Sequence, residues 1–238
     1  MIYRNNKLLI DKISVNRIAN QFGTPAYCYS YNKLKENILK FKKNFRKINP
    51  TICFAVKANN NIKILSEIRK FGFGADVVSK GELLAALKSK INPKKIVFSG
   101  VGKTYDEIKF AIKKKILLIN SESESEIKKI SKLAKKLKIN VDIGIRFNPN
   151  VDAKTINEIT TGKISNKFGL DEKEVHRLIN KYKNSKYLNI KCLSVHIGSQ
   201  ITSHVPYIKM LKAVQKIINK SKFNFEYIDL GGGMGINY

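Results

Sequence analysis

Lys57 directly follows the short apolar run Cys53–Val56. Such a run predicts a buried strand, and we expect the ammonium group at its end to lie at or near the interior of the fold. Burial disfavours the charged form of a lysine, and a neutral amine is the form that reacts with an aldehyde to give a Schiff base. Residue 57 is therefore a candidate nucleophile. A lysine that only leaves the strand end for water is the alternative.

A run of three glycines, Gly231–Gly233, follows a second apolar stretch, Phe225–Leu230. Because glycines carry no side chain, successive N–H groups can point together at an anion, and a phosphate is the natural ligand. The spacing does not match G-x-G-x-x-G, so the run does not predict a dinucleotide site. An ordinary tight turn is the alternative, since glycine serves turns as well.

Three further polar positions stand near the ends of apolar stretches. His196 is followed by Ser199 and Gln200, whose hydroxyl and amide groups are donors that could reach a bound phosphate. Asp76 and Arg146 are charges at strand ends, where an unpaired charge is costly, so each needs a partner. A structural histidine and structural ion pairs are the alternatives.

The elements that position these residues alternate along the chain. From residue 50 onward, short apolar or β-branched runs alternate with longer segments whose apolar residues recur every three or four positions. This alternation is typical of strand–helix units with a parallel sheet. The expected strands are Thr51–Val56, Ala75–Val78, Lys95–Ser99, Ile116–Asn120, Val141–Phe147, Ile190–His196 and Phe225–Leu230. The expected helices are Ile62–Phe71, Lys80–Lys90, Tyr105–Lys114, Glu122–Leu137, Asp171–Lys183 and Tyr207–Asn219.

Two of these helices carry recognisable start signals. Thr104 is followed three residues later by Glu107, which predicts a capping box. Ser121 precedes the acidic residues Glu122 and Glu124, which predicts that Ser121 caps the helix that follows.

Units of this kind form either an open doubly wound sheet or a closed barrel of eight strand–helix units, and spacing alone does not decide between them. In both architectures the chemistry lies at the carboxyl ends of the strands, where the candidate residues fall. One long connection, Asn148–Leu170, has no helical period. Loops of that length inside compact domains are usually functional, often as lids.

The composition indicates a globular chain without a membrane segment. Of the 238 residues 43% are hydrophobic, no apolar run approaches the roughly 20 residues of a spanning helix, and the first residues lack the apolar region of a signal peptide. Three cysteines without C-x-x-C spacing predict neither a disulfide framework nor a metal site and fit a reducing cytoplasm. The net charge of +28 comes mostly from lysines spread over amphipathic segments, so we expect no nucleic-acid partner.

An ordered set of short motifs resembles the fold type III pyridoxal-phosphate enzymes, and among them most closely the diaminopimelate decarboxylases. The resemblance covers nearly the whole chain, and the ordered set is far more specific than any one of its members. The motifs are Phe22–Pro25, Ala55–Asn59, Gly74–Ser79 with Gly81–Leu83, Phe98–Lys103, Asn148–Asp152, Thr161–Gly162 with Asn166–Gly169, His196–Gln200 and Gly231–Gly233.

The resemblance implies that pyridoxal 5′-phosphate (PLP) is bound covalently to Lys57, with His196 stacked on its ring and the glycine run around its phosphate. It makes Lys57 and His196 catalytic and gives Glu82 and Gln200 supporting positions. The cofactor-binding residues that it implies are Lys57, Asp76, Arg146, His196, Ser199, Gly231, Gly232 and Gly233.

The fold that the resemblance implies is α/β: a PLP-binding (β/α)8 barrel of the alanine racemase type, incomplete at its C-terminal end. Residues 1–29 are then the N-terminal segment of a second, β-rich domain, and residues 30–238 form the barrel without its last strand. The resembled enzymes continue through an eighth strand and a C-terminal β domain with further substrate contacts. We therefore expect these residues to be the front portion of an enzyme, inactive and prone to aggregate by themselves.

The implied activity is decarboxylation of meso-2,6-diaminopimelate to L-lysine and carbon dioxide, the last step of lysine biosynthesis, by a cytoplasmic homodimer. Two alternatives stay open. One is another fold type III decarboxylase, acting on ornithine, arginine or carboxynorspermidine. The other is a basic nucleic-acid-binding protein without enzymatic activity, because a strongly positive chain could also bind phosphates.

Overall fold

The computed structural model describes residues 1–153 and 168–236, and its contacts divide the chain into two compact units, Met1–Thr51 and Ile52–Tyr238. The first unit holds a small antiparallel sheet and two helices that were not expected from the sequence. Its elements are β1 (Ile2–Arg4), β2 (Lys7–Ile10), β3 (Ile13–Ser14), α1 (Val15–Phe22) and α2 (Tyr31–Phe45).

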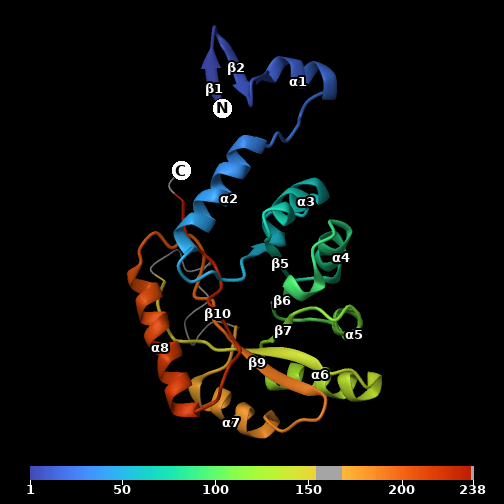
Figure 1. Ribbon diagram of the computed structural model, residues 1–238, viewed down its shortest axis with the longest axis vertical. Helices are drawn as coiled ribbons and strands as arrows, with labels where there is room; N and C mark the ends of the chain where they lie inside the picture. Colours follow the sequence, from blue (N-terminus) through green and yellow to red (C-terminus); the bar gives the residue numbers. More distant parts are fainter. Residues whose placement is uncertain (154–167, 237–238) are drawn as a thin grey trace. The chain divides into compact units, whose positions relative to one another are not determined.

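The second unit contains a sheet of seven parallel strands, one for each strand expected from the sequence (Figure 1). They are β4 (Cys53–Ala55), β5 (Gly74–Val77), β6 (Ile96–Phe98), β7 (Leu118–Ser121), β8 (Val141–Arg146), β9 (Leu188–Ser194) and β10 (Tyr227–Asp229).

The strand order decides between the two architectures that the spacing left open. In a doubly wound sheet the order reverses at a switch point, whereas here it runs from β4 to β10 without reversal, as it does around a barrel. The sheet curls, and β4 and β10 are its two edges among the described residues. The expected fold class is thus confirmed: these strands form the larger part of a (β/α)8-type barrel.

Helices follow one another around the outside of the curled sheet (Figure 1). The apolar face of each packs on the strands; in α6, for example, Ile127, Ile130 and Leu133 are fully buried. A second apolar cluster, smaller than the core between strands and helices, lies on the inward faces of the strands around Leu118 and Cys192. The helices are α3 (Ile62–Lys70), α4 (Lys80–Lys88), α5 (Tyr105–Lys113), α6 (Glu124–Leu137), α7 (Glu172–Tyr182) and α8 (Val205–Ser221), with the short 3₁₀ helices η1 (Val56–Ala58) and η2 (Pro93–Lys95).

One of the two predicted helix starts is confirmed and the other is wrong. Thr104 caps α5, and the capping box with Glu107 is complete. The cap of α6 is Ser123, whose hydroxyl accepts from the Glu126 N–H, and not Ser121. Ser121 is the last residue of β7, because the strand runs one residue further than predicted and delays the helix.

The long connection after β8 is described only at its ends. Phe147 pairs with Leu170 in an isolated parallel bridge, so the two ends of the connection lie side by side. Residues 154–167, which include the Thr161–Gly162 motif and the first part of the Asn166–Gly169 motif, lie outside the described residues.

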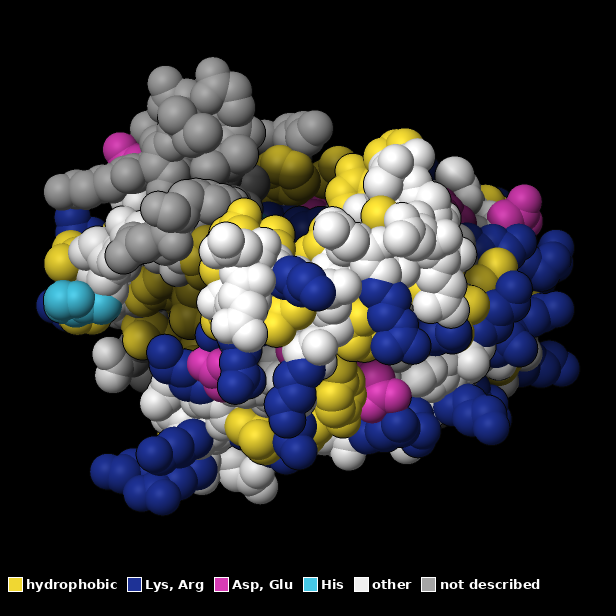
Figure 2. Space-filling model, turned by 90° about the horizontal axis from the view of Figure 1, so that it is seen from above, with side chains coloured by type: hydrophobic (Ala, Val, Ile, Leu, Met, Phe, Trp, Pro, Cys, Tyr) yellow, Lys and Arg dark blue, Asp and Glu magenta, His cyan; other side chains and the backbone are white. Residues whose placement is uncertain are grey.

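The positive charge is dispersed on the one face of the molecule that Figure 2 shows. On the face shown in Figure 2, lysine and arginine side chains stand at many separate places among hydrophobic ones. None of the helices in residues 1–153 and 168–236 combines the length and the apolar character that crossing a bilayer requires.

Candidate active site

The principal candidates lie at the carboxyl ends of the parallel strands, which together form one end of the barrel. Asp76 belongs to β5, and Arg146 is the last residue of β8. Lys57 lies in η1 directly after β4, His196 follows β9, and Gly231–Gly233 follow β10. The topology therefore brings together residues that are far apart in the sequence.

Lys57 is exposed, so the expectation that the preceding apolar run would bury its ammonium was wrong. The reason is that β4 is an edge strand of the sheet, and η1 leaves that edge with only Val56 buried. The positive charge of Lys57 nevertheless acts on Asp76 and on His196. The amine is thus accessible while it stays within electrostatic reach of groups from β5 and from the segment after β9.

The glycine run folds back against the segment that carries His196. Gly231 and Gly233 have φ values of 65° and 85°, in the left-handed region that favours glycine. A Cβ on Gly231 would lie 2.6 Å from the Val195 carbonyl oxygen and 2.7 Å from His196 Nδ1. The Gly232 N–H donates to His196 Nδ1 at 3.2 Å. Close approach of the two segments therefore excludes a side chain at Gly231 and at Gly233.

His196 is held in its neutral form. Burial, followed by the positive charges of Arg146 and Lys57, lowers the pKa of His196 to about 4. Because Nδ1 accepts the hydrogen bond from Gly232, the single proton of the neutral ring is on Nε2. The imidazole thus presents an uncharged ring with a defined tautomer.

The pKa of Asp76 is shifted in the opposite direction. Burial raises the pKa of Asp76 to about 6; the negative charge of Asp229 adds to the rise, while the hydrogen bond from Ser99 and the charge of Lys57 oppose it. The Ser99 hydroxyl donates to Asp76 Oδ1 at 2.6 Å. The hydrogen-bond partner of Asp76 is therefore a hydroxyl group. The alternative, a structural ion pair of Asp76, is not found among the described residues.

Arg146 does form a buried ion pair. Its NH1 group donates to Glu122 Oε1 at 2.7 Å, and both side chains are less than one-tenth exposed. The guanidinium also lies 4.7 Å from the ring centroid of Phe168. Behind this pair, the buried Lys103 binds Glu126 at 2.9 Å. Each buried charge in this set thus has an opposite charge next to it, as burial requires.

The supporting candidates lie beside these groups. Glu82 Oε2 accepts from the Val78 N–H at 2.9 Å in the first turn of α4, and its charge contributes to the raised pKa of Asp76. Gln200 Oε1 accepts from the Ile236 N–H at 3.1 Å, just beyond the glycine run. Ser199 is half-buried and lies between His196 and Gln200.

Sequence reasoning missed four polar residues that connect the candidates: Ser99, Asn120, Ser194 and Asp229. Hydrogen bonds link them to one another and to Asp76. The sequence did contain a signal for two of them. Asn120 and Asp229 each stand at or next to the carboxyl end of an expected apolar strand, as the candidates do.

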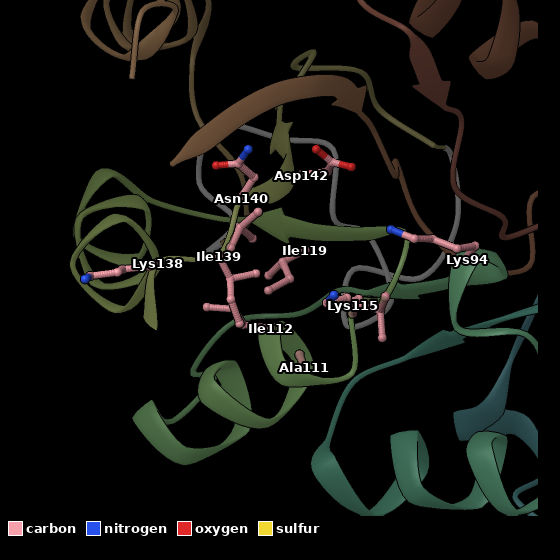
Figure 3. A pocket seen from close by; sticks show the side chains of 11 residues that line it. Lys94, Ala111, Ile112, Lys115, Ile119, Lys138, Ile139, Asn140 and Asp142 are labelled. Carbon is pink, nitrogen blue, oxygen red and sulfur yellow. The ribbon is translucent and has the colours of Figure 1, made fainter. Parts of the chain in front are cut away.

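A cavity of about 320 Å³ lies elsewhere, at the opposite ends of the strands (Figure 3). Its lining comes from the C-terminal ends of α5 and α6 and from the start of β8, and includes Ile112, Ile119 and Asn140. No candidate residue lines it. Since chemistry in such barrels lies at the carboxyl ends of the strands, this cavity is not part of the candidate site.

The residues present fit the cofactor that the resemblance implies. Lys57 offers an accessible amine for an aldehyde, and His196 offers a neutral ring. The turn at Gly231–Gly233 is fixed on one side and open on the other, since nothing lies within 4 Å of a Cβ position on Gly232. A phosphate can therefore approach the backbone at the open side.

Comparison with known proteins identifies the family. Residues 31–238 match a family model described as "Pyridoxal-dependent decarboxylase, pyridoxal binding domain". The chain is similar to the diaminopimelate decarboxylase of Aquifex aeolicus (strain VF5), with 40% identity over 245 residues, 99% of this chain and 56% of the relative.

Two solved structures are also similar. Diaminopimelate decarboxylase from Helicobacter pylori complexed with L-lysine has 41% identity and a TM-score of 0.89, and the match covers 93% of this chain and 57% of that one. The enzyme of that name from M. jannaschii in co-complex with L-lysine has 35% identity and a TM-score of 0.91, over 98% of this chain and 56% of that one. The chain thus spans little more than half the length of these relatives.

Proposed function

Because the chain belongs to the pyridoxal-dependent decarboxylases, whose pyridoxal-binding domain its residues 31–238 match, we propose that it supplies the cofactor-binding barrel of a diaminopimelate decarboxylase. The proposed reaction is the decarboxylation of meso-2,6-diaminopimelate to L-lysine and carbon dioxide. Relatives of that name, 34–43% identical over most of the chain, support this substrate. The observation that carries the proposal is that Lys57, His196 and the glycine turn all follow the carboxyl ends of parallel strands, with Gly232 bound to His196 and Lys57 within electrostatic reach of His196.

The proposed roles are those that the resemblance implies, and the positions of these residues after the carboxyl ends of the strands support them. Lys57 would bind the aldehyde of PLP, His196 would contact its ring, and Ser199 with Gly231, Gly232 and Gly233 would hold its phosphate. Asp76 and Arg146 complete the cofactor site, with Glu82 and Gln200 in support. When bound, PLP supplies a conjugated ring that accepts the electrons left by the departing carboxylate.

The chain's own residues set the protonation states for this chemistry. The uncharged imidazole of His196 accepts a hydrogen bond at Nδ1 and adds no positive charge beside the ring. Asp76 can hold or release a proton near neutral pH, because its pKa is about 6. Its carboxyl group lies within electrostatic reach of Lys57, so it is suited to balance the charge of that amine.

The remaining parts of the proposal concern the whole protein. Residues 1–29 are proposed to belong to a second, β-rich domain, of which β1–β3 are a part, and residues 30–238 to the barrel. The protein is proposed to act in the cytoplasm as a homodimer. That its three cysteines predict no disulfide framework supports a reducing compartment.

The test uses protein expressed from the complete reading frame that contains these residues. With PLP we expect a visible absorbance band that borohydride removes, and release of L-lysine and carbon dioxide from meso-2,6-diaminopimelate. Lys57→Ala removes both, because no other amine occupies that position. Lys113→Ala, a lysine at the end of α5, is the matched control and retains both.

Three results would contradict the proposal or a part of it. If Lys57→Ala keeps the borohydride-sensitive band, the covalent role of Lys57 is wrong. If arginine or ornithine is decarboxylated and meso-2,6-diaminopimelate is not, the substrate is wrong. Binding of duplex DNA that weakens steeply with salt, without any such band, would favour the nucleic-acid alternative.

A further inference from the structure

We propose that Asn120 is a positioning residue for the phosphate-binding turn, which it holds through Asp229. This inference rests on the proposed function, since it concerns how the chain binds PLP. Asn120 belongs to β7 and is 1% exposed, and neither the family match nor the sequence motifs assign it a role.

The first step is the hydrogen bond that Asn120 makes across the interior of the barrel. Its Nδ2 group donates to Asp229 Oδ2 at 2.8 Å. The strands β7 and β10 are not neighbours, because β8 and β9 lie between them. This bond therefore fixes the end of β10 directly to a central strand, independently of the sheet's own ladder.

The second step leads from Asp229 to the glycine run. Asp229 Oδ1 accepts from the Gly231 N–H at 2.9 Å, while Oδ2 accepts from Asn120 and from the Ser194 hydroxyl at 3.1 Å. The carboxylate is thus bound on both oxygens, and its orientation sets where Gly231 begins the turn. Because Gly231 adopts a left-handed conformation, a shift of this anchor alters the direction of the N–H groups that follow.

The third step is the place that the structure makes for Asn120. Leu118 and Asn120 lie on the inward face of β7, since side chains alternate along a strand. Opposite Asn120, on β8, stands Gly144, where a Cβ would overlap Asn120 Oδ1. The sheet register also shifts between Ile143 and Gly144. A glycine and an irregularity in the neighbouring strand thus leave room for this amide.

The amide is better suited to this position than a carboxylate of the same size. Its second Nδ2 hydrogen donates to Ser99 Oγ at 3.3 Å, and Ser99 in turn donates to Asp76. The amide therefore donates to Asp229 directly, and to the hydroxyl of Ser99 that binds the second acidic group, Asp76. A third carboxylate between them would add repulsion and could donate only when protonated.

The experiment compares PLP with pyridoxal, which lacks the phosphate, in protein from the complete reading frame. Dissociation constants of both are measured by absorbance titration for the wild type and for Asn120→Ala. We expect Asn120→Ala to weaken PLP binding by about ten-fold or more and pyridoxal binding less, because the bond to Asp229 holds the phosphate-binding turn, whereas loss of the longer bond to Ser99 affects both compounds alike. An unchanged ratio of the two constants in folded Asn120→Ala overturns the inference.

A second variant, Asn120→Asp, preserves the size of the side chain and adds a pH dependence. Its preference for PLP over pyridoxal is expected to be low at about pH 8 and to recover toward about pH 5.5, as the new carboxyl group takes up a proton and donates as the amide does. If Asn120→Ala does not fold, this profile decides: a wild-type preference throughout, or a low one throughout, overturns the inference.

Ser121→Ala is the matched control, since Ser121 is buried on the opposite face of the same strand. It is expected to keep the wild-type ratio. The proposed function has a separate readout, the borohydride-sensitive band that depends on Lys57. If the wild type has this band while the variants keep its preference for PLP, only the role of Asn120 fails; if the wild type lacks the band, the proposed function fails as well.

Discussion

His196 and Asp76 have pKa values displaced in opposite directions, to about 4 and about 6, with burial as the largest cause in each case. The unfolded chain protonates His196 near 6.5 but the folded chain does so only near 4, so this group lowers the free energy of unfolding as the pH falls through that interval. The folded chain keeps a proton on Asp76 up to about 6, whereas the unfolded chain releases it near 3.8, so this group lowers stability as the pH rises. The two contributions oppose each other in the wild type.

Asp76→Asn removes the contribution of Asp76 to the pH dependence of stability and leaves that of His196. Relative to the wild type, the free energy of unfolding of the variant is expected to gain about 2.5 kcal/mol between about pH 4 and about pH 7, because the wild type must ionise a buried carboxyl group over that range. Urea unfolding of the apoprotein at several pH values measures the difference. Asp106→Asn, an exposed change of the same type in the first turn of α5, is the control. A difference between Asp76→Asn and the wild type that does not vary with pH would show that Asp76 titrates at its ordinary value.

The residues of the candidate site differ in how far the sequence could predict them. Lys57, His196 and the glycine run could be found because each follows an apolar stretch and matches a motif. The burial of Lys57 could not be predicted, because it depends on whether the preceding strand lies at an edge of the sheet. The bond between Asn120 and Asp229 joins residues 109 positions apart, and no local pattern reports such a contact.

At the scale of elements, hydrophobic periodicity predicted every strand and α-helix described in the second unit but not the helices of the first unit. A signal was present in α2, where Leu34, Ile38 and Phe41 recur at helical spacing. Helix starts depended on single residues: Thr104 was correct because its capping box is local, whereas Ser121 was wrong because strand pairing extends β7 by one residue.

Successive helices are joined by acidic residues from their first turns. Glu124 of α6 binds Arg177 and Lys181 of α7 at 2.7 and 2.6 Å, and Glu172 of α7 binds two lysines of α8, Lys216 and Lys220, at 2.8 and 2.6 Å. In each case the two cations are four residues apart and so lie on one face of their helix. In a chain with only 18 acidic residues, each of these carboxylates joins two helices.

The double variant Glu124→Gln, Glu172→Gln tests these contacts. We expect it to melt a few degrees below the wild type at low salt and to approach the wild type in about 1 M NaCl, because salt screens exposed ion pairs. Melting followed by circular dichroism measures both conditions. Glu36→Gln breaks an exposed pair within α2 alone and should change little. A deficit that persists undiminished at high salt would assign the effect to packing instead of charge.

At the scale of the whole molecule, the seven-stranded sheet has β4 and β10 as its edges among the described residues. An edge strand presents unpaired N–H and C=O groups on which another chain can pair. On β10, Ile228 is 38% exposed, so the edge is apolar as well as unpaired.

We therefore expect these 238 residues, expressed by themselves, to associate with one another, and Ile228→Lys to reduce that association by placing a charge on the edge. Light scattering at increasing protein concentration measures it. Leu211→Lys makes the same kind of change on an exposed apolar position of α8 and should leave the association as it is. If both variants scatter less light to the same extent, net charge and not the strand edge controls association.

The carboxylates of Glu124 and Glu172 also have a direction along the chain: each precedes the cations that it binds. During synthesis on the ribosome, the anion of α6 has already emerged when α7 leaves the exit tunnel, and the anion of α7 has emerged before α8. The carboxylate that binds each new helix is thus already present on the helix made just before it. The helices outside the sheet can therefore assemble in the order of translation.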